Sequence, residues 1–229
     1  MSRHLLNAME SLRKLCEGVS QMVIRSLEEV HKMFRAEDGR GLRFLLKLND
    51  SISREEIKIE EECLKIQALY QPSGKELRTV TAHLKMNQYL ERISVRILQI
   101  SYLLKDLQAS PDLYFSSELC ELARRTTYLT QKSLQALADE DLIEAKAICR
   151  GDPIAGELQK LLYDQYISIM QNGDMSPEEG AKFYRILLEF RYIEELLCCI
   201  AGDTIYLING EMFRPQAVGM IRPFEDPDT

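Results

Sequence analysis

Glu91 is the first residue of this chain whose surroundings suggest metal chemistry. It lies beside the apolar stripe of a predicted helix, whose members recur at steps of four and three residues: Met86, Leu90, Ile93, Ile97, Ile100 and Leu104. Two carboxylates four residues apart share a helix face and can hold a cation together. The residue four positions after Glu91 is Val95, so the second carboxylate is missing. Glu91 therefore belongs to an altered metal site, or it is an ordinary residue on the flank of a helix.

Two further polar residues, Asn49 and Glu56, lie on the apolar seam of the preceding predicted helix, at about residues 42–70. A buried amide or carboxylate costs free energy unless it is paired. Such residues can fix the register of packed helices, or the seam can open to solvent there. Alternatively, carboxylates from neighbouring helices converge, and their mutual repulsion calls for a cation.

The polar positions on this seam recur later in the chain. The residues 103 positions after Asn49 and Glu56 are Asp152 and Gln159, again on a seam of fours and threes. The third and sixth helical segments match in the same way at an offset of 100 residues. We therefore predict two three-helix units related by duplication.

Turn signals divide the chain into six helical segments. They are Asp38-Gly39-Arg40-Gly41, Gln71-Pro72-Ser73-Gly74, Ser110-Pro111, the region near Asp139, and Asn172-Gly173. The last segment opens with Ser176-Pro177-Glu178-Glu179, which is typical of a capped helix start, and runs into Gly210. Pro153 should kink the fifth segment or mark its true start. No segment alternates as a strand would, so the predicted fold is all-α.

These boundaries imply three regions. A first three-helix unit covers residues 1–110 and a second covers residues 111–214. Residues 215–229 contain prolines without periodicity, so we expect an irregular or disordered tail.

The amino-acid composition limits which binding partners and which cellular compartment the protein can have. The 229 residues are 45% hydrophobic and 28% charged, with a net charge of −7, so no basic excess is available to neutralise the phosphates of a nucleic acid. No stretch is long and apolar enough for a membrane span. The six cysteines are scattered without a CxxC pair, which favours free thiols in a reducing compartment. We expect a cytoplasmic protein that binds no nucleic acid and does not insert into a membrane.

Enzymatic chemistry finds little support in the sequence. A di-iron carboxylate bundle needs Glu-x-x-His on two helices. Glu28-x-x-His31 is one instance, but His4 and His83 have no Glu three residues before them. The histidines and cysteines form no recognisable nucleophilic triad, and there is no phosphate-binding loop. A carboxylate-bridged metalloenzyme is the distant alternative.

Three stretches of the sequence resemble the PhoU family. QALYQPSGKELRTVTAHLKMNQYLERI (67–93) is similar to that family's Gln-Pro turn, followed by a helix that opens with an acidic residue, Leu and Arg and reaches Leu-Glu-Arg-Ile. NDSISREEIKIEEEC (49–63) resembles its second helix, and IAGDTIYLINGEMFR (200–214) its closing helix. The resemblance runs in order from about residue 5 to residue 214.

The resemblance implies two three-helix bundles related by a pseudo-twofold axis. It also implies a cytoplasmic, non-enzymatic regulator of phosphate uptake that contacts an ABC phosphate transporter, a membrane sensor kinase, or both. Several members of the family bind one multinuclear metal cluster per repeat through acidic motifs.

The metal motif of the family transfers only in part. Its four carboxylate positions fall at Asn49, Glu56, Glu91 and Val95 in the first repeat, and at Asp152, Gln159, Arg191 and Glu195 in the second. Each site keeps two of four carboxylates, and Arg191 places a guanidinium where a metal would need an acid. We predict a salt-bridge cluster in the second repeat. In the first we expect no cofactor, or at most a weak Mg²⁺ or Mn²⁺ contact.

Other functions remain compatible with these residues. The chain could serve a secondary phosphate permease, or it could be a helical interaction protein that has lost the link to phosphate. Met22, Ile24 and Met33 widen the apolar face of the first helix. They either form an exposed stripe for a homodimer or a transporter subunit, or pack within the same bundle.

Overall fold

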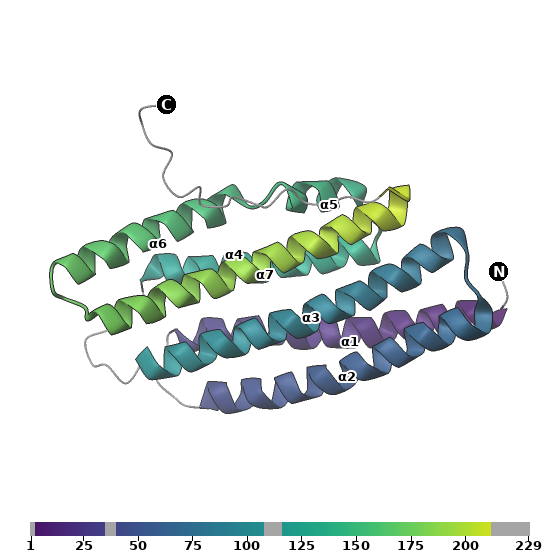
Figure 1. Ribbon diagram of the computed structural model, residues 1–229, viewed down its shortest axis with the longest axis horizontal. Helices are drawn as coiled ribbons and strands as arrows, with labels where there is room; N and C mark the ends of the chain where they lie inside the picture. The colour runs from purple at the N-terminus through teal and green to yellow at the C-terminus, as the bar shows by residue number, and fades with distance from the viewer. Residues whose placement is uncertain (1–2, 35–39, 108–115, 212–229) are drawn as a thin grey trace.

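The computed structural model describes residues 3–34, 40–107 and 116–211, and these contain α-helices and no strand (Figure 1). The helices are α1 (Arg3–Met33), α2 (Arg40–Tyr70), α3 (Gly74–Leu107), α4 (Ser117–Ala138), α5 (Leu142–Cys149), α6 (Pro153–Gln171) and α7 (Pro177–Asn209). The all-α prediction is confirmed. The predicted fifth segment is present as two pieces, α5 and α6.

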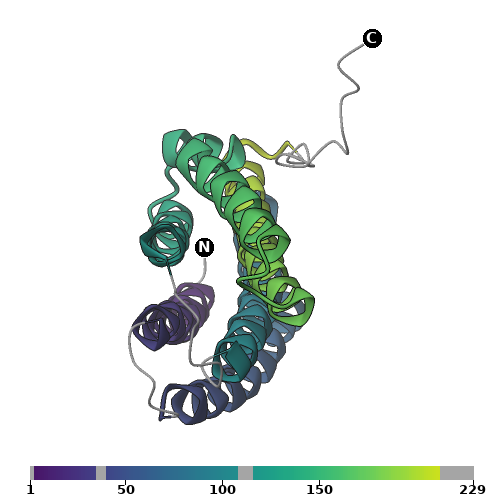
Figure 2. The same cartoon turned by 90° about the vertical axis from the view of Figure 1, so that its left-hand side faces the viewer.

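The helices form two three-helix units that pack side by side. Helices α1, α2 and α3 pack on one another, and α4 and α7 pack with α5 and α6 in the same way. Between the units, α3 lies along α7 and α1 lies along α4, so equivalent helices meet across the boundary. Figure 2 shows α2, α3, α7 and α6 as a curved layer, with α1 and α4 on its inner side. The pairing of like with like is what a pseudo-twofold relation predicts.

The break between α5 and α6 follows directly from the local sequence. Gly151 has a φ of 83°, in the left-handed region that glycine adopts without strain. Asp152 then caps α6, and Pro153 occupies its first turn, where the missing N–H of proline costs nothing. Pro153 therefore marks the true start of a helix, one of the two outcomes expected.

The two ends of α7 are capped as the sequence predicted. Ser176 and Glu179 form a reciprocal capping box at its start. At its other end Gly210 has a φ of 77° and closes the helix with a left-handed residue. Arg78 of α3 donates from Nε to the Leu207 carbonyl at 3.0 Å, which ties the last turn of α7 to the first unit.

The buried apolar residues of both units form one continuous core, with a smaller cluster between α4, α5 and α7. The extra apolar residues of α1 belong to this core. Ile24 and Met33 are buried, and Met22 is partly buried against the core. They pack within the chain, so α1 presents no exposed apolar stripe at these positions.

A buried ionic contact joins the units at their centre. Glu189 of α7 is 3% exposed and accepts a hydrogen bond from Arg96 Nη1 of α3 at 3.3 Å. Arg185 Nε lies 3.7 Å from the other carboxylate oxygen, and the Arg96 guanidinium also covers the Tyr192 ring at 4.8 Å. A buried carboxylate needs such partners, so this contact fixes how α3 and α7 align.

Two predicted boundaries fall outside the described residues: the junction between residues 110 and 111, and the tail at 215–229. Within the described ranges, none of the helices combines the length and the apolar character needed to span a bilayer.

Candidate functional site

The first-repeat cluster consists of Asn49 and Glu56 on α2 and Glu91 and Ser94 on α3. Ser94 Oγ donates to Asn49 Oδ1 at 2.9 Å across the two helices. Ser94 is buried and Asn49 partly buried, so this hydrogen bond pairs a polar group on the seam. The seam position of Asn49 is therefore explained by a contact between α2 and α3.

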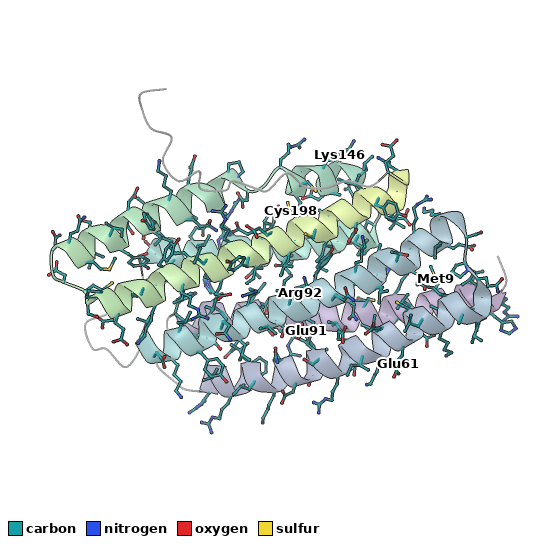
Figure 3. All side chains as sticks on the ribbon, in the orientation of Figure 1. Met9, Glu61, Glu91, Arg92, Lys146 and Cys198 are labelled. Atoms are coloured by element: carbon teal, nitrogen blue, oxygen red, sulfur yellow. The ribbon has the colours of Figure 1, made fainter. Side chains whose placement is uncertain are left out.

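Glu56 and Glu91 lie within electrostatic range of each other. Burial raises the pKa of Glu56, and the negative charges of Glu60 and Glu91 raise it further. All three causes disfavour the ionised form of Glu56. Figure 3 shows Glu91 on α3 and Glu61 on the neighbouring α2.

Asn87 supports the first-repeat cluster from α3. It is fully buried, and its Nδ2 donates to the Glu56 carbonyl at 2.9 Å. This bond holds the backbone of α2 against α3 beside the Glu56 side chain. Val95 is partly buried and offers no ligand atom.

The second-repeat cluster consists of Arg125 on α4, Asp152 and Gln159 on α6, and Glu194 on α7. Arg125 and Asp152 form a bidentate ion pair, with Nε–Oδ2 at 2.8 Å and Nη2–Oδ1 at 2.7 Å. The Asp152 side chain is only 6% exposed. A planar guanidinium that matches both carboxylate oxygens is the strongest geometry for such a pair.

Asp152 also caps the N-terminus of α6. Its Oδ1 also accepts from the backbone N–H groups of Ile154 at 3.0 Å and Ala155 at 3.4 Å. Both carboxylate oxygens of Asp152 therefore accept hydrogen bonds, which leaves few lone pairs free to bind a metal.

Glu194 of α7 is half-buried, and its carboxyl group is held away from water. Burial raises its pKa to about 8, and the negative charge of Asp152 contributes next. Gln159 Nε2 donates to Glu194 Oε2 at 3.2 Å, whereas Oε1 is buried without a protein partner. Glu194 thus adds a neutral carboxyl group to the cluster rather than a second negative charge.

Arg191 and Glu195 lie at the edge of this cluster. They pair along α7, with 3.5 Å between Arg191 Nε and Glu195 Oε1, and the Glu195 side chain is 45% exposed. The bidentate partner of Asp152 is Arg125 from α4, and not the neighbouring Arg191 that the sequence placed at a ligand position. Glu194 links these residues, because Gln159 donates to it and the charges of Asp152, Arg191 and Glu195 all act on it.

The donors present do not fit the metal clusters that the family resemblance implies. In the second repeat Asp152 is saturated by Arg125 and the backbone, and Glu194 is protonated. In the first repeat Glu56 and Glu91 are the two carboxylates present at the four motif positions, since Asn49 and Val95 occupy the others. Across the described ranges, no group of three or more His, Cys, Asp or Glu side chains has a metal-binding arrangement.

Sequence reasoning missed Glu194 and Arg125. A signal for Glu194 existed, because it lies 100 positions after Ser94, the partner of Asn49. Equivalent positions on α3 and α7 thus carry Ser94 and Glu194, each facing the polar residue of the adjacent helix. Arg125 comes from α4, and nothing in its sequence spacing ties it to Asp152.

A separate cavity of about 540 Å³ lies between α1, α3 and α4. Its lining includes the buried His83 together with Arg13, Glu17 and Glu140. Burial lowers the pKa of His83, whose Nδ1 bonds to the Thr79 carbonyl at 2.8 Å. The residues inferred from the family motif do not line this cavity.

Known proteins align with most of the chain. The family described as PhoU domain matches residues 17–104, which is most of the first repeat. A phosphate-specific transport system accessory protein PhoU homolog 2 of Thermotoga maritima is 22% identical over 214 residues, covering 89% of both chains. A PhoU homolog of Deinococcus radiodurans with the same accessory-protein name is 28% identical over 202 residues, covering 87% of this chain and 95% of that one.

Solved structures show the same fold. PhoU from Pseudomonas aeruginosa superposes with a TM-score of 0.83 at 20% identity, covering 90% of this chain and 99% of that one. The phosphate transport system regulatory protein PhoU from Streptococcus pneumoniae has the same TM-score at 18% identity, with coverages of 92% and 99%. Residues 17–104 therefore match the PhoU domain, and the chain has the fold of paired three-helix bundles seen in the PhoU structures.

Proposed function

We propose that this protein is a non-enzymatic regulator of phosphate uptake and phosphate signalling. It acts through contacts with a subunit of an ABC phosphate transporter, with a sensor kinase, or with both. The observation that carries the proposal is the alignment of nearly the whole chain with proteins named phosphate-specific transport system accessory proteins. A cytoplasmic location follows from that role.

The chemistry of both clusters supports a scaffold rather than an active site. In the second-repeat cluster the Asp152 carboxylate forms an ion pair and caps a helix. In the first-repeat cluster a hydrogen bond joins α2 to α3. In neither place does a nucleophile meet a general base, which is the arrangement that acyl or phosphoryl transfer requires. Protein contacts remain as the means of action.

The outer face of α2 suits such a contact. Ile57 and Leu64 are 55% and 53% exposed and lie two helical turns apart on one side of the helix. Exposed aliphatic side chains bordered by charged residues are typical of protein interaction surfaces. Lys58 and Lys65 follow them at the same spacing and form ion pairs with Glu55 and Glu62.

Capture of partners tests the proposal. The full chain, immobilised, should retain the nucleotide-binding subunit of an ABC phosphate transporter or the catalytic region of the sensor kinase from the same genome. Replacing Ile57 and Leu64 together by Ser should weaken that retention about tenfold or more, because the apolar contact is lost. Replacing Lys58 and Lys65 by Ser is the matched control and should change it little.

Three outcomes distinguish the binding surface, the phosphate assignment and the type of carrier. Retention that is unaffected by the apolar pair would move the contact away from α2 and leave the function standing. Failure to bind any phosphate-system protein of the same genome would overturn the phosphate assignment and leave the fold intact. Retention of a secondary phosphate permease in place of the ABC subunit would favour that alternative carrier.

The oligomeric state follows from the same experiment. We propose that the protein can form a homodimer through its exposed helix faces, as an alternative use of the α2 surface. Sedimentation of the wild type and the Ile57/Leu64 variant, compared at equal concentration, would show whether self-association and partner binding share this face.

A further inference from the structure

The small apolar cluster between α4, α5 and α7 brings two buried cysteines together. Cys149 is the last residue of α5, and Cys198 lies in the middle of α7 (Figure 3). Cys149 Sγ lies 3.7 Å from the Cys198 carbonyl, and Cys198 Sγ lies 3.4 Å from the Ile148 carbonyl. Each sulfur thus touches the backbone that carries the other.

Small side chains make this approach possible. Ala136, Ala145 and Ala201 fill the same cluster and are almost completely buried. Because alanine extends only one carbon from the backbone, α5 can lie close to α7. Disulfide formation requires β-carbons about 3.5–4.5 Å apart, a separation that only closely packed backbones provide.

The two thiols also differ in reactivity. A hydrogen bond from the Cys198 thiol lowers the pKa of Cys149, despite the burial of Cys149. The same contact, followed by burial, raises the pKa of Cys198. Two thiols that interact directly and each touch the backbone beside the other are placed as the attacking and resolving sulfurs of a redox couple must be.

We propose that Cys149 and Cys198 form a reversible disulfide when the protein meets a peroxide. This covalent site is independent of the proposed function and of both polar clusters. The Cys149 thiolate attacks one oxygen of hydrogen peroxide and becomes a sulfenic acid, and the other oxygen leaves as water after taking up a proton. The Cys198 sulfur then attacks the sulfenic sulfur, loses its proton, and displaces a second water. Two thiols lose two electrons and two protons, and peroxide accepts both.

The disulfide would lie next to the second-repeat cluster. Glu194 is one helical turn before Cys198 on α7. Asp152 follows Cys149 by three residues, across the break between α5 and α6. The link would hold this break against α7, so amide exchange in residues 142–152 should slow on oxidation.

The chain supplies its own control in Cys16 and Cys63. These buried thiols on α1 and α2 also lie within range of each other. Burial raises the pKa of Cys63 to about 12 and that of Cys16 still higher. Neither is a ready nucleophile, so their cross-linking should be at least about tenfold slower.

The test uses the full reduced chain treated with hydrogen peroxide. Thiol titration under denaturing conditions should show two fewer thiols than the six in the sequence, restored by dithiothreitol. Peptide mapping should link the Cys149 peptide to the peptide that carries Cys198 and Cys199. The link should be lost in Cys149→Ser and in Cys198→Ser, and kept in Cys199→Ser.

Several results would overturn the site. A link that persists in Cys198→Ser assigns the bond to Cys199, and loss of thiols first at Cys16 and Cys63 reverses the reactivity argued above. Survival of all six thiols under conditions that oxidise free cysteine would also refute it. Peptide mapping of the wild type identifies the disulfide directly. The proposal can therefore be refuted even if a cysteine variant fails to fold.

Discussion

The two repeats carry polar clusters at matching places but balance their charges in different ways. In the first repeat, Glu56 and Glu91 face each other near solvent, and both are partly buried. In the second, Arg125 neutralises Asp152 inside the bundle, and Glu194 keeps its proton. The same arrangement of helices thus leaves the acids of the first repeat near solvent, whereas in the second repeat an internal guanidinium neutralises the acid.

The contrast reflects how far each cluster lies from water. A half-exposed pair of acids keeps its hydration and tolerates repulsion. A carboxylate as buried as that of Asp152 must be paired, because isolated burial costs several kcal/mol. The second repeat therefore depends on its ion pair for stability, whereas the first does not.

The largest effect should come from removing Arg125. Arg125→Met leaves Asp152 buried without its counter-charge and should cost about 3 kcal/mol in the free energy of unfolding, measured by urea denaturation. Arg124→Met is the matched control, because Arg124 is exposed and pairs only with Glu121 along the surface of α4. The control should lose less than about 0.5 kcal/mol. Equal losses would show that Arg125 stabilises nothing beyond an ordinary surface pair.

The second effect concerns Glu194 and depends on pH. Its folded pKa of about 8 exceeds the ordinary 4.5, so the folded state binds more protons between these values. Wild-type stability should therefore fall as pH rises from 4.5 to 8. Glu194→Gln removes this slope and should be more stable than wild type above pH 8, by about 3 kcal/mol.

Denaturation across pH 5–9 measures this difference directly. Glu195→Gln, one residue further along α7 and 45% exposed, is the control and should leave the slope unchanged. A Glu194→Gln variant with the wild-type pH profile would mean that Glu194 is ionised in the folded protein.

The third effect is smaller and concerns the contribution of Glu56, in the first repeat, to the stability of the fold. Burial and the neighbouring acids raise the pKa of Glu56, so its ionisation destabilises the fold above pH 4.5. Glu56→Gln should stabilise the protein at pH 7 by less than about 1 kcal/mol. Glu61→Gln, an exposed neighbour on α2, should not differ from wild type. A marked loss of stability in Glu56→Gln would give that carboxylate an ionic partner.

The smallest effect concerns metal. Millimolar Mn²⁺ should raise the melting temperature by about 1 °C through Glu56 and Glu91, and Glu91→Gln should abolish the shift. Elemental analysis after desalting should find no retained metal. Iron or zinc retained near one equivalent per chain would refute the expectation that the second repeat is a salt-bridge cluster and that the first binds at most weakly.

Local sequence signals located most of the architecture. The capping box at Ser176, the glycine at the end of α7 and the proline at the start of α6 act within one helical turn, so their effects are readable without the fold. The matched polar positions Asn49 and Asp152 make different contacts: Asn49 bonds to Ser94 on α3, whereas Asp152 caps α6 and pairs with Arg125 on α4. The spacing of polar residues therefore pointed to two similar units, but it did not predict the contacts within each.

Only part of the candidate site could be predicted from the sequence. Glu56 and Glu91 were expected at one metal site; the structure places them within electrostatic range of each other, and a metal there stays a prediction. Arg191 was expected at the other, where it pairs with Glu195 and its charge acts on Glu194, while the bidentate pair with Asp152 belongs to Arg125. Spacing along one helix predicts which residues share a face. It carries no information on which side chain of another helix meets them.

By itself the sequence determined an all-helical, duplicated chain with acidic seams and no basic excess, since periodicity, capping and net charge are local or summed properties. Only the tertiary structure decided which charges are buried, which arginine reaches Asp152, and that Glu194 and Cys198 lie beside α5 and α6. Those outcomes depend on how helices from distant parts of the chain exclude water, and exclusion of water sets both pKa values and the free energy of an ion pair.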